Sequence, residues 1–144
     1  MAARSGSNVL TMKSGGSQLL ERNFERKTVA AVNGMAVAAT SIFTTDADLG
    51  YFAIRQIVVE VLSIPDTTQA QISIGTNAAT YDNVVPLTAL AFTGANRART
   101  FGFDAAGGGV MLAAGTQLFV NVQIAGTVGG AHVFNVSVIG YYIG

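Results

Sequence analysis

The sequence predicts an all-β fold: an antiparallel β-sandwich or jelly-roll of seven to eight strands with an extended N-terminal arm. Two segments near the C-terminal end alternate apolar and polar residues with a period of two, as a strand with one buried face does. Short apolar runs separated by turn residues recur through the rest of the chain. No segment of ten residues or more has a strong helical pattern. Together these observations favour antiparallel strands in two packed layers.

Residues 1–27 are expected to form a flexible basic arm. They are interrupted by glycine and serine at 5–8 and 14–17, a composition that buries too little apolar surface to offset the entropy of ordering. The end of the arm, residues 18–27, either forms a short helical turn or lies extended across a neighbouring subunit. We favour the extended form, because a segment of this length is too short for a stable isolated helix.

The end of the arm also contains the residues that we expect to bind a partner. Three of its side chains are apolar and can bury surface on docking, while three are basic and can pair with acidic groups of the partner. Ordering the arm on docking costs entropy, so one arm should bind modestly and several arms on one oligomer should recover affinity. The candidate partner-binding residues are Leu19, Leu20, Arg22, Phe24, Arg26 and Lys27.

Residues 28–144 are expected to form one β-sandwich domain, because a chain of 144 residues suffices for a single hydrophobic core. The longest apolar run ends at Pro65, which cannot donate to a sheet ladder and so marks the end of its strand. A shorter run alternates, with Ala70, Ile72 and Ile74 inward. Before the last two strands, we expect strands at residues 35–44, 51–64, 69–74, 87–92, 99–103 and 110–112.

The two alternating segments near the end of the chain are the clearest strands. In residues 117–124, one face of the strand carries Leu118, Val120, Val122 and Ile124. In the next strand, one face carries Phe134, Val136 and Val138. The linker at 125–130 contains the glycines that a turn requires, so we expect these two strands to form a hairpin.

The surface of the protein is short of charge. Charged residues make up 11% of the chain and hydrophobic residues 50%, whereas soluble domains usually have about 25% charged residues. This balance favours burial against copies of the same chain or within a larger assembly. The alternative is a surface covered by the plentiful Ser, Thr, Asn and Gln. We predict an oligomer with apolar side chains at its subunit contacts.

The charges are unevenly placed although the formal net charge is zero. Residues 1–27 hold five basic and two acidic side chains and carry a net charge of +3. Residues 28–144 hold three basic and six acidic side chains, with histidine counted as neutral, and carry a net charge of −3. A basic arm therefore precedes a mildly acidic body. Arg97 and Arg99 beside one short strand indicate a solvated edge, where charge discourages edge-to-edge aggregation.

Composition also argues against nucleic acid and membrane partners. A net charge of zero gives no bulk attraction to nucleic acid or to an anionic membrane surface. No apolar run reaches the roughly 18 residues of a membrane span, and the first residues lack the hydrophobic segment of a secretory signal. We expect a protein made in a cytoplasm that binds neither nucleic acid nor membrane.

The sequence predicts no enzyme activity, metal or cofactor. It has no cysteine, and His132 is its only histidine, whereas catalytic triads and most histidine metal sites need several placed partners. We expect His132 at the surface or at a sheet edge. Asp46 and Asp48 begin like a calcium loop, but Tyr51 and Ile57 replace the required glycine and glutamate. These aspartates are expected to be turn residues that bond their own backbone.

Three stretches of the chain, residues 74–86, 114–118 and 136–142, carry a resemblance to a known group of proteins. Over roughly residues 50–142 the chain resembles small β-sandwich virion proteins of tailed bacteriophages, especially capsid decoration (cement) proteins. The resemblance is one of pattern, and similar strings also occur in phage fibre and baseplate domains.

The resemblance implies a homotrimer on the exterior of the capsid of a virion, made in the host cytoplasm. Such a trimer bridges neighbouring subunits of the major capsid protein, often through N-terminal segments, and has no catalytic residues. The alternative function is a receptor- or glycan-binding domain of a phage fibre or baseplate.

Overall fold

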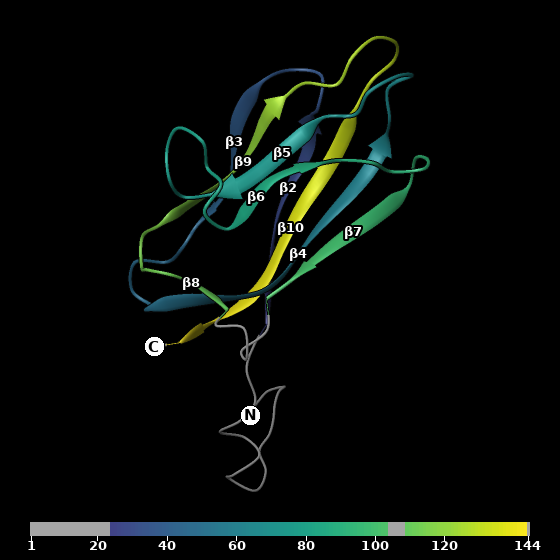
Figure 1. The fold of residues 1–144 in the computed structure, drawn as a ribbon. Helices are drawn as coiled ribbons and strands as arrows, with labels where there is room; N and C mark the ends of the chain where they lie inside the picture. The colour runs from purple at the N-terminus through teal and green to yellow at the C-terminus, as the bar shows by residue number, and fades with distance from the viewer. Residues whose placement is uncertain (1–23, 104–108, 144) are drawn as a thin grey trace, which may run out of the picture.

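In the computed structural model, which describes residues 24–103 and 109–143, the chain forms two antiparallel sheets, one of five strands and one of four (Figure 1). No helix occurs in these two ranges. The predicted all-β antiparallel sandwich is therefore confirmed. The strands are β2 (Glu25–Asn33), β3 (Ala38–Thr44), β4 (Tyr51–Ser63), β5 (Gln71–Gly75), β6 (Val85–Ala89), β7 (Arg97–Gly102), β8 (Val110–Leu112), β9 (Gln117–Ile124) and β10 (Val133–Ile143).

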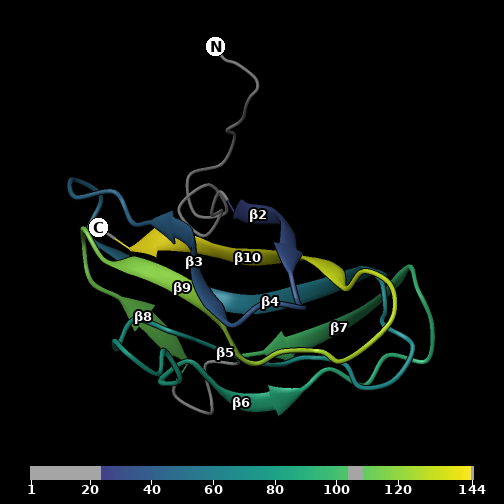
Figure 2. The same ribbon diagram turned by 90° about the horizontal axis from the view of Figure 1, so that it is seen from above.

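The strand pairing is that of a jelly-roll. Strand β2 pairs with β10, β3 with β9, β4 with β7 and β5 with β6, all antiparallel. Such nested pairing arises when one long antiparallel hairpin folds over on itself, so that its successive strand pairs lie in alternate sheets. One sheet has the order β2-β10-β4-β7, with short β8 added beside β4, and the other has the order β3-β9-β5-β6. Figure 2 shows the two layers from above.

Strands β9 and β10 do not form the expected hairpin, because they lie in different sheets. Alternation specifies that each strand has one buried face, and this requirement is met equally by a hairpin and by two strands facing each other across the core. The connecting loop crosses from one sheet to the other and is held by backbone bonds. The N–H of Gly126 donates to the carbonyl of Gly34, and that of Thr127 donates to the carbonyl of Thr68, both at 2.8 Å.

Strand β2 was not expected from the sequence. Its first residues, Glu25, Arg26 and Lys27, were assigned to the arm, but they pair with Gly140, Ile139 and Val138 of β10. Three consecutive charged side chains at the start of the strand resemble a solvated segment more than a β-strand. The first described strand thus begins at Glu25, within the segment expected to be the arm.

The core lies between the two sheets and is built from the inward positions of the central strands. On β10, Phe134, Val136 and Val138 are fully buried, as their alternation predicts. They face a second set of fully buried side chains from the other sheet, among them Ile72, Ile74, Leu118 and Val120. Each such side chain stabilises the fold by about 1.5–3 kcal/mol relative to an exposed position.

The expected inside–outside pattern fails at the end of β9 and at polar positions. Ile124, expected inward, is exposed because it is the last residue of its strand. Asn121 and Ser137 alternate with the inward apolar residues and would therefore point outward, but both are buried, and each has a hydrogen-bond partner. The amide of Asn121 donates to the carbonyl of Thr80 at 3.0 Å, and the hydroxyls of Ser137 and Thr28 are 2.9 Å apart. Burial of these groups is tolerated because they are paired.

Gly140 is required where β10 crosses an irregularity in its pairing with β4. The register shifts between Ile139 and Gly140, and a Cβ at Gly140 would overlap the carbonyl oxygen of Ala53 and the ring of Phe52. Bulged positions of this kind often need a glycine because backbone and side chains approach closely.

We expect Gly140→Ala to lower the free energy of unfolding by about 3 kcal/mol, because a fully buried ring and a backbone carbonyl cannot both move aside. Urea unfolding followed by circular dichroism measures the change. Gly102→Ala is the matched control, because a Cβ there meets no atom within 4 Å, and its stability should stay within about 1 kcal/mol of the parent. Equal stability of the two variants would contradict the predicted overlap.

Candidate functional site

The candidate partner-binding residues fall into two groups. Leu19, Leu20 and Arg22 lie outside the described residues. Phe24, Arg26 and Lys27 are described, and they mark the place where the arm joins the body, at the start of β2 (Figure 1). We call the surface around these three residues the arm root.

Phe24 is an exposed aromatic side chain at the arm root. Its side chain is 58% exposed, although its ring packs edge-on against the ring of Tyr141 with the centroids 5.4 Å apart. Edge-to-face contacts of this kind are favourable beyond the area that they bury. The contact holds Phe24 against β10, and it leaves most of the Phe24 side chain exposed.

The two basic residues of the arm root already have acidic neighbours in their own chain. The guanidinium of Arg26 lies 3.6 Å from a carboxylate oxygen of Glu60, and the ammonium of Lys27 lies 3.0 Å from that of Glu25. The hydrogen bond that the Lys27 ammonium donates to the Glu25 carboxylate raises the pKa of Lys27 above its ordinary value. Exposed pairs contribute little to stability, but they partly neutralise the charges that were expected to meet a partner's acids.

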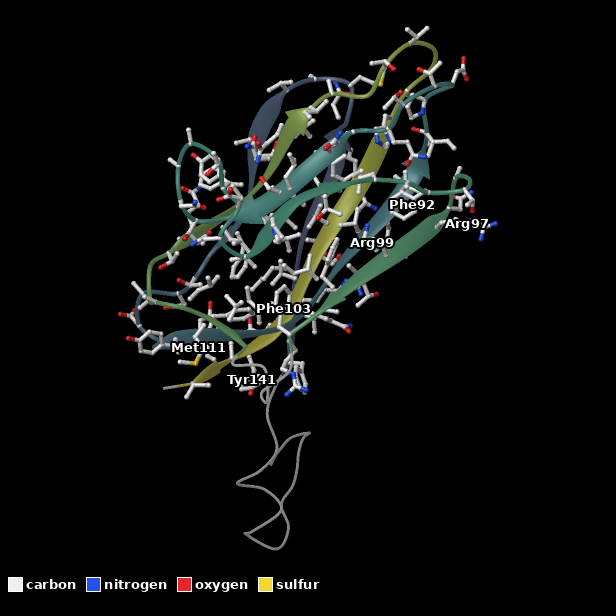
Figure 3. The ribbon with its side chains drawn as sticks, in the orientation of Figure 1. Phe92, Arg97, Arg99, Phe103, Met111 and Tyr141 are labelled. Carbon is white, nitrogen blue, oxygen red and sulfur yellow. The ribbon has the colours of Figure 1, made fainter. Side chains whose placement is uncertain are left out.

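An apolar hollow lies beside the arm root. Its volume is about 380 Å³, and Tyr141, whose ring contacts Phe24, is part of its lining. Met111 adds a side chain that is 54% exposed, and Figure 3 shows Phe103, Met111 and Tyr141 at the same end of the sandwich. Through Tyr141 the hollow adjoins Phe24 of the arm root. The full lining is Ala53, Ile54, Arg55, Phe103, Gly109, Val110, Met111, Tyr141 and Ile143.

The sequence alone did not reveal this hollow. Its lining comes from β4, β8, β10 and the segment after β7, which are far apart in the chain and meet only through the jelly-roll pairing. The one available signal was the pair Tyr141–Tyr142 near the end of the last alternating strand. Tyr142 has a different role, because its hydroxyl accepts a hydrogen bond from the N–H of Asp46 at 2.8 Å.

His132 is fully buried, so the expectation of a surface or edge position is wrong. The loop that crosses between the sheets carries it over one end of the core, where its Nδ1 lies 3.1 Å from the carbonyl oxygen of Ser63. Its ring centroid is 5.7 Å from that of Phe134, and a Cβ at Gly34 would overlap the imidazole. Within the described part of the chain, its Nε2 has no hydrogen-bond partner. The contacts indicate a packing role.

The acidic residues singled out in the sequence form a turn. The side chain of Asp46 accepts a hydrogen bond from the N–H of Asp48 at 2.8 Å, which confirms that Asp46 bonds its own backbone. In residues 24–103 and 109–143, no three His, Cys, Asp or Glu side chains lie close enough together to hold a metal ion. The same residues contain no helix long and apolar enough to cross a membrane.

A second exposed feature is the polar loop between β5 and β6. The side-chain oxygen of Asn77 accepts hydrogen bonds from the N–H groups of Asp82 and Asn83, at 2.9 and 3.2 Å. The amide nitrogen of Asn77 donates to the carboxylate of Asp82 at 2.8 Å, and this bond, together with one from Thr80, lowers the pKa of Asp82. The carbonyl of Thr80 accepts from Ser73 at 2.8 Å, so the loop is tied to its sheet.

Comparison with known proteins gives a match in fold. No family model matches the sequence, and no curated protein matches it. Among solved structures, the chain is similar to a chain described as "Cyanophage Pam1 capsid asymmetric unit", with 13% sequence identity and a TM-score of 0.52. The match covers 97% of this chain and 97% of that chain. At this identity the similarity shows a shared fold.

Proposed function

We propose that this chain is a structural virion protein of a tailed bacteriophage, and specifically a capsid decoration (cement) protein that binds the outer capsid across subunit junctions. The observation that carries the proposal is the match to a chain of the cyanophage Pam1 capsid asymmetric unit over 97% of both lengths. A match of this extent includes all the described strands of the jelly-roll.

The surface composition supports an assembled rather than a solitary protein. Only 11% of the residues are charged, and several large apolar side chains are exposed, including Met111, Tyr51 and Val128. Met111 lies in the apolar hollow, and an apolar concave surface short of charge favours contact with another chain. We propose a homotrimer as the working unit, and light scattering at micromolar concentration should give three times the monomer mass of 14.8 kDa. A mass equal to that of the monomer would contradict the trimer.

The arm root supports a role for the N-terminal segment in anchoring. Phe24 and the hollow lined by Met111 and Tyr141 place an apolar surface where the basic arm leaves the body. In the proposed function, the partners of the arm are the major capsid protein and neighbouring copies of this chain. Binding to the assembled shell and not to its free subunits stabilises the shell by mass action.

The proposed site of action is the exterior of the capsid, after synthesis in the host cytoplasm. A receptor- or glycan-binding domain of a fibre or baseplate is the alternative function. The fold match favours the capsid role, because the similar chain is described as part of a capsid asymmetric unit.

The proposal is tested by adding the purified protein to capsids that lack it and, separately, to purified tails. We expect saturable sedimentation with capsids at a fixed ratio to the major capsid protein, and an increase in the temperature at which the shells lose integrity. Sedimentation with tails alone would support the fibre or baseplate function instead.

A further inference from the structure

We propose that the open side of the sandwich, between strands β6 and β7, binds an extended acidic peptide segment of a partner subunit. In this proposal the segment adds along the free edge of β7 and places its carboxylates beside Arg97 and Arg99. The identification of that partner as a shell subunit rests on the proposed function. We call this side of the molecule the β6–β7 seam, and Figure 3 shows Phe92, Arg97 and Arg99 along it.

The seam exists because β6 and β7 are the last strands of their sheets. Each is hydrogen-bonded to one neighbouring strand, β5 and β4 respectively, and the two are not paired with each other. The outer edge of β7 thus presents backbone N–H and C=O groups that no described strand satisfies. Free edges of this kind are templates for an added strand.

The register of β7 turns both arginines toward the space between the sheets. Arg97 and Arg99 lie directly opposite Val61 and Val59 of β4, which are fully buried core residues. Directly opposed residues of an antiparallel pair share one face of the sheet. The two arginines therefore lie on the inner face, yet both are exposed because the seam is open.

Two hollows follow one another along the seam. One, of about 250 Å³, is lined by Ala91, Phe92, Thr93, Arg97, Ala98 and Arg99. The next, of about 240 Å³, is lined by Val84, Val85, Pro86, Thr88, Phe101, Gly102 and Phe103. Phe103 also lines the hollow beside the arm root. The combination of apolar side chains and two guanidinium groups suits a peptide that alternates apolar and acidic residues.

The two seam arginines are not neutralised by an acidic side chain of the described residues. Within the described residues, neither Arg97 nor Arg99 forms an ion pair. The guanidinium of Arg99 lies over the ring of Phe101, 4.8 Å from its centroid, and bonds the carbonyl of Ala89 only at 3.5 Å. Together with Arg55, which lines the hollow beside the arm root, they are the only basic residues of segment 28–144 other than its histidine. Two of the three arginines of this net-negative segment therefore lie at the seam.

The positive charge of the chain's own arm argues against this arm as the segment that binds the seam. Residues 1–24 contain Arg4, Lys13 and Arg22 against one acid, Glu21, so the arm is basic like the seam. The free strand edge favours a peptide over a nucleic acid, because only a peptide backbone has the repeat that pairs with it. The edge of β7 is the one that accepts the peptide, since β6 contains Pro86, which has no N–H to donate.

The test uses labelled synthetic peptides with the full-length protein. The probes are a blocked Glu-Val alternating heptapeptide, the matching Lys-Val heptapeptide and a single-stranded DNA of similar charge. We expect the Glu-Val peptide to bind at least about ten-fold more tightly than the Lys-Val peptide, a difference that salt reduces. We also expect it to slow hydrogen exchange of the amides of β7 and not of β2.

The variant Arg97→Glu/Arg99→Glu should lose at least ten-fold in affinity for the Glu-Val peptide. Arg4→Glu/Lys13→Glu is the matched control, because it changes the net charge equally and leaves both the seam and the candidate partner-binding residues unchanged; it should bind as the parent does. Circular dichroism checks that both variants are folded.

Equal binding by the two variants, or absence of protection at β7, would overturn the proposal. Tighter binding of DNA would point to a nucleic acid partner instead. If the seam variant aggregates and the parent binds no peptide, the role of the arginines is to prevent edge-to-edge aggregation, and the proposal fails. None of these experiments uses capsids, so such a failure leaves the proposed capsid role untouched.

Discussion

Replacement of Phe134 by alanine is expected to lower the free energy of unfolding by about 3–5 kcal/mol. Phe134 is fully buried on β10, the strand that lies between β2 and β4 in the five-stranded sheet. Its ring is close to the imidazole of His132, which covers one end of the core. Removing the ring leaves a cavity that the surrounding strands cannot collapse to fill, because each is held by its own ladder of hydrogen bonds.

Chemical unfolding in urea, followed by far-ultraviolet circular dichroism, measures this loss. The matched control is Phe24→Ala, since the Phe24 side chain is 58% exposed and touches the body mainly through Tyr141. The control should change stability by less than about 1 kcal/mol. If the two variants lost the same amount, Phe134 would not be the core residue that the structure shows.

Deletion of residues 1–23 is expected to leave a folded, oligomeric body that binds capsids at least about 100-fold more weakly. Every described strand remains, because the first of them begins at Glu25. The deletion removes Leu19, Leu20 and Arg22, the arm residues proposed to contact the shell. When several arms of one oligomer bind the same shell, effective concentration raises the overall affinity far above that of one arm. Removing the modest contact of every arm therefore weakens binding strongly.

Capsid sedimentation with truncated and full-length protein measures this effect, and circular dichroism verifies that β-structure is intact. Deletion of residues 1–17 is the matched control, because it removes the glycine- and serine-rich part and keeps Leu19 and Leu20. We expect the control to retain most of the affinity. Equal binding by the full-length protein and by the protein lacking residues 1–23 would show that the body is the anchor.

The fold class followed from the sequence because burial of one strand face leaves a local signal. Alternation in Leu118, Val120 and Val122 marks a half-buried strand whichever strand it faces. The alternation does not reveal which strands each strand pairs with. The pairing of β9 with β3 and β5, and of β10 with β2 and β4, depends on contacts distant in the chain, so a hairpin and a jelly-roll predict the same pattern.

Other features were missed because their signals are ambiguous or absent. The first residues of β2 are charged, and this local composition assigns them to the arm. Only their pairing with β10 makes them a strand. His132 was placed at the surface because a single histidine near a turn is usually solvated, whereas the crossing loop buries it. The candidate arm residues were chosen on local charge and hydrophobicity, and the structure adds that Arg26 and Lys27 already contact acids.

The most direct test of the central claim, that this jelly-roll is a decoration protein on the exterior of a capsid, is electron cryomicroscopy of intact particles of the virus that encodes the chain. We expect density that fits the two-sheet body on the outer capsid surface, over junctions between major capsid subunits, with density continuing from Glu25 toward the shell. Density for this body only in a fibre or baseplate, or no density on the capsid exterior, would contradict the claim.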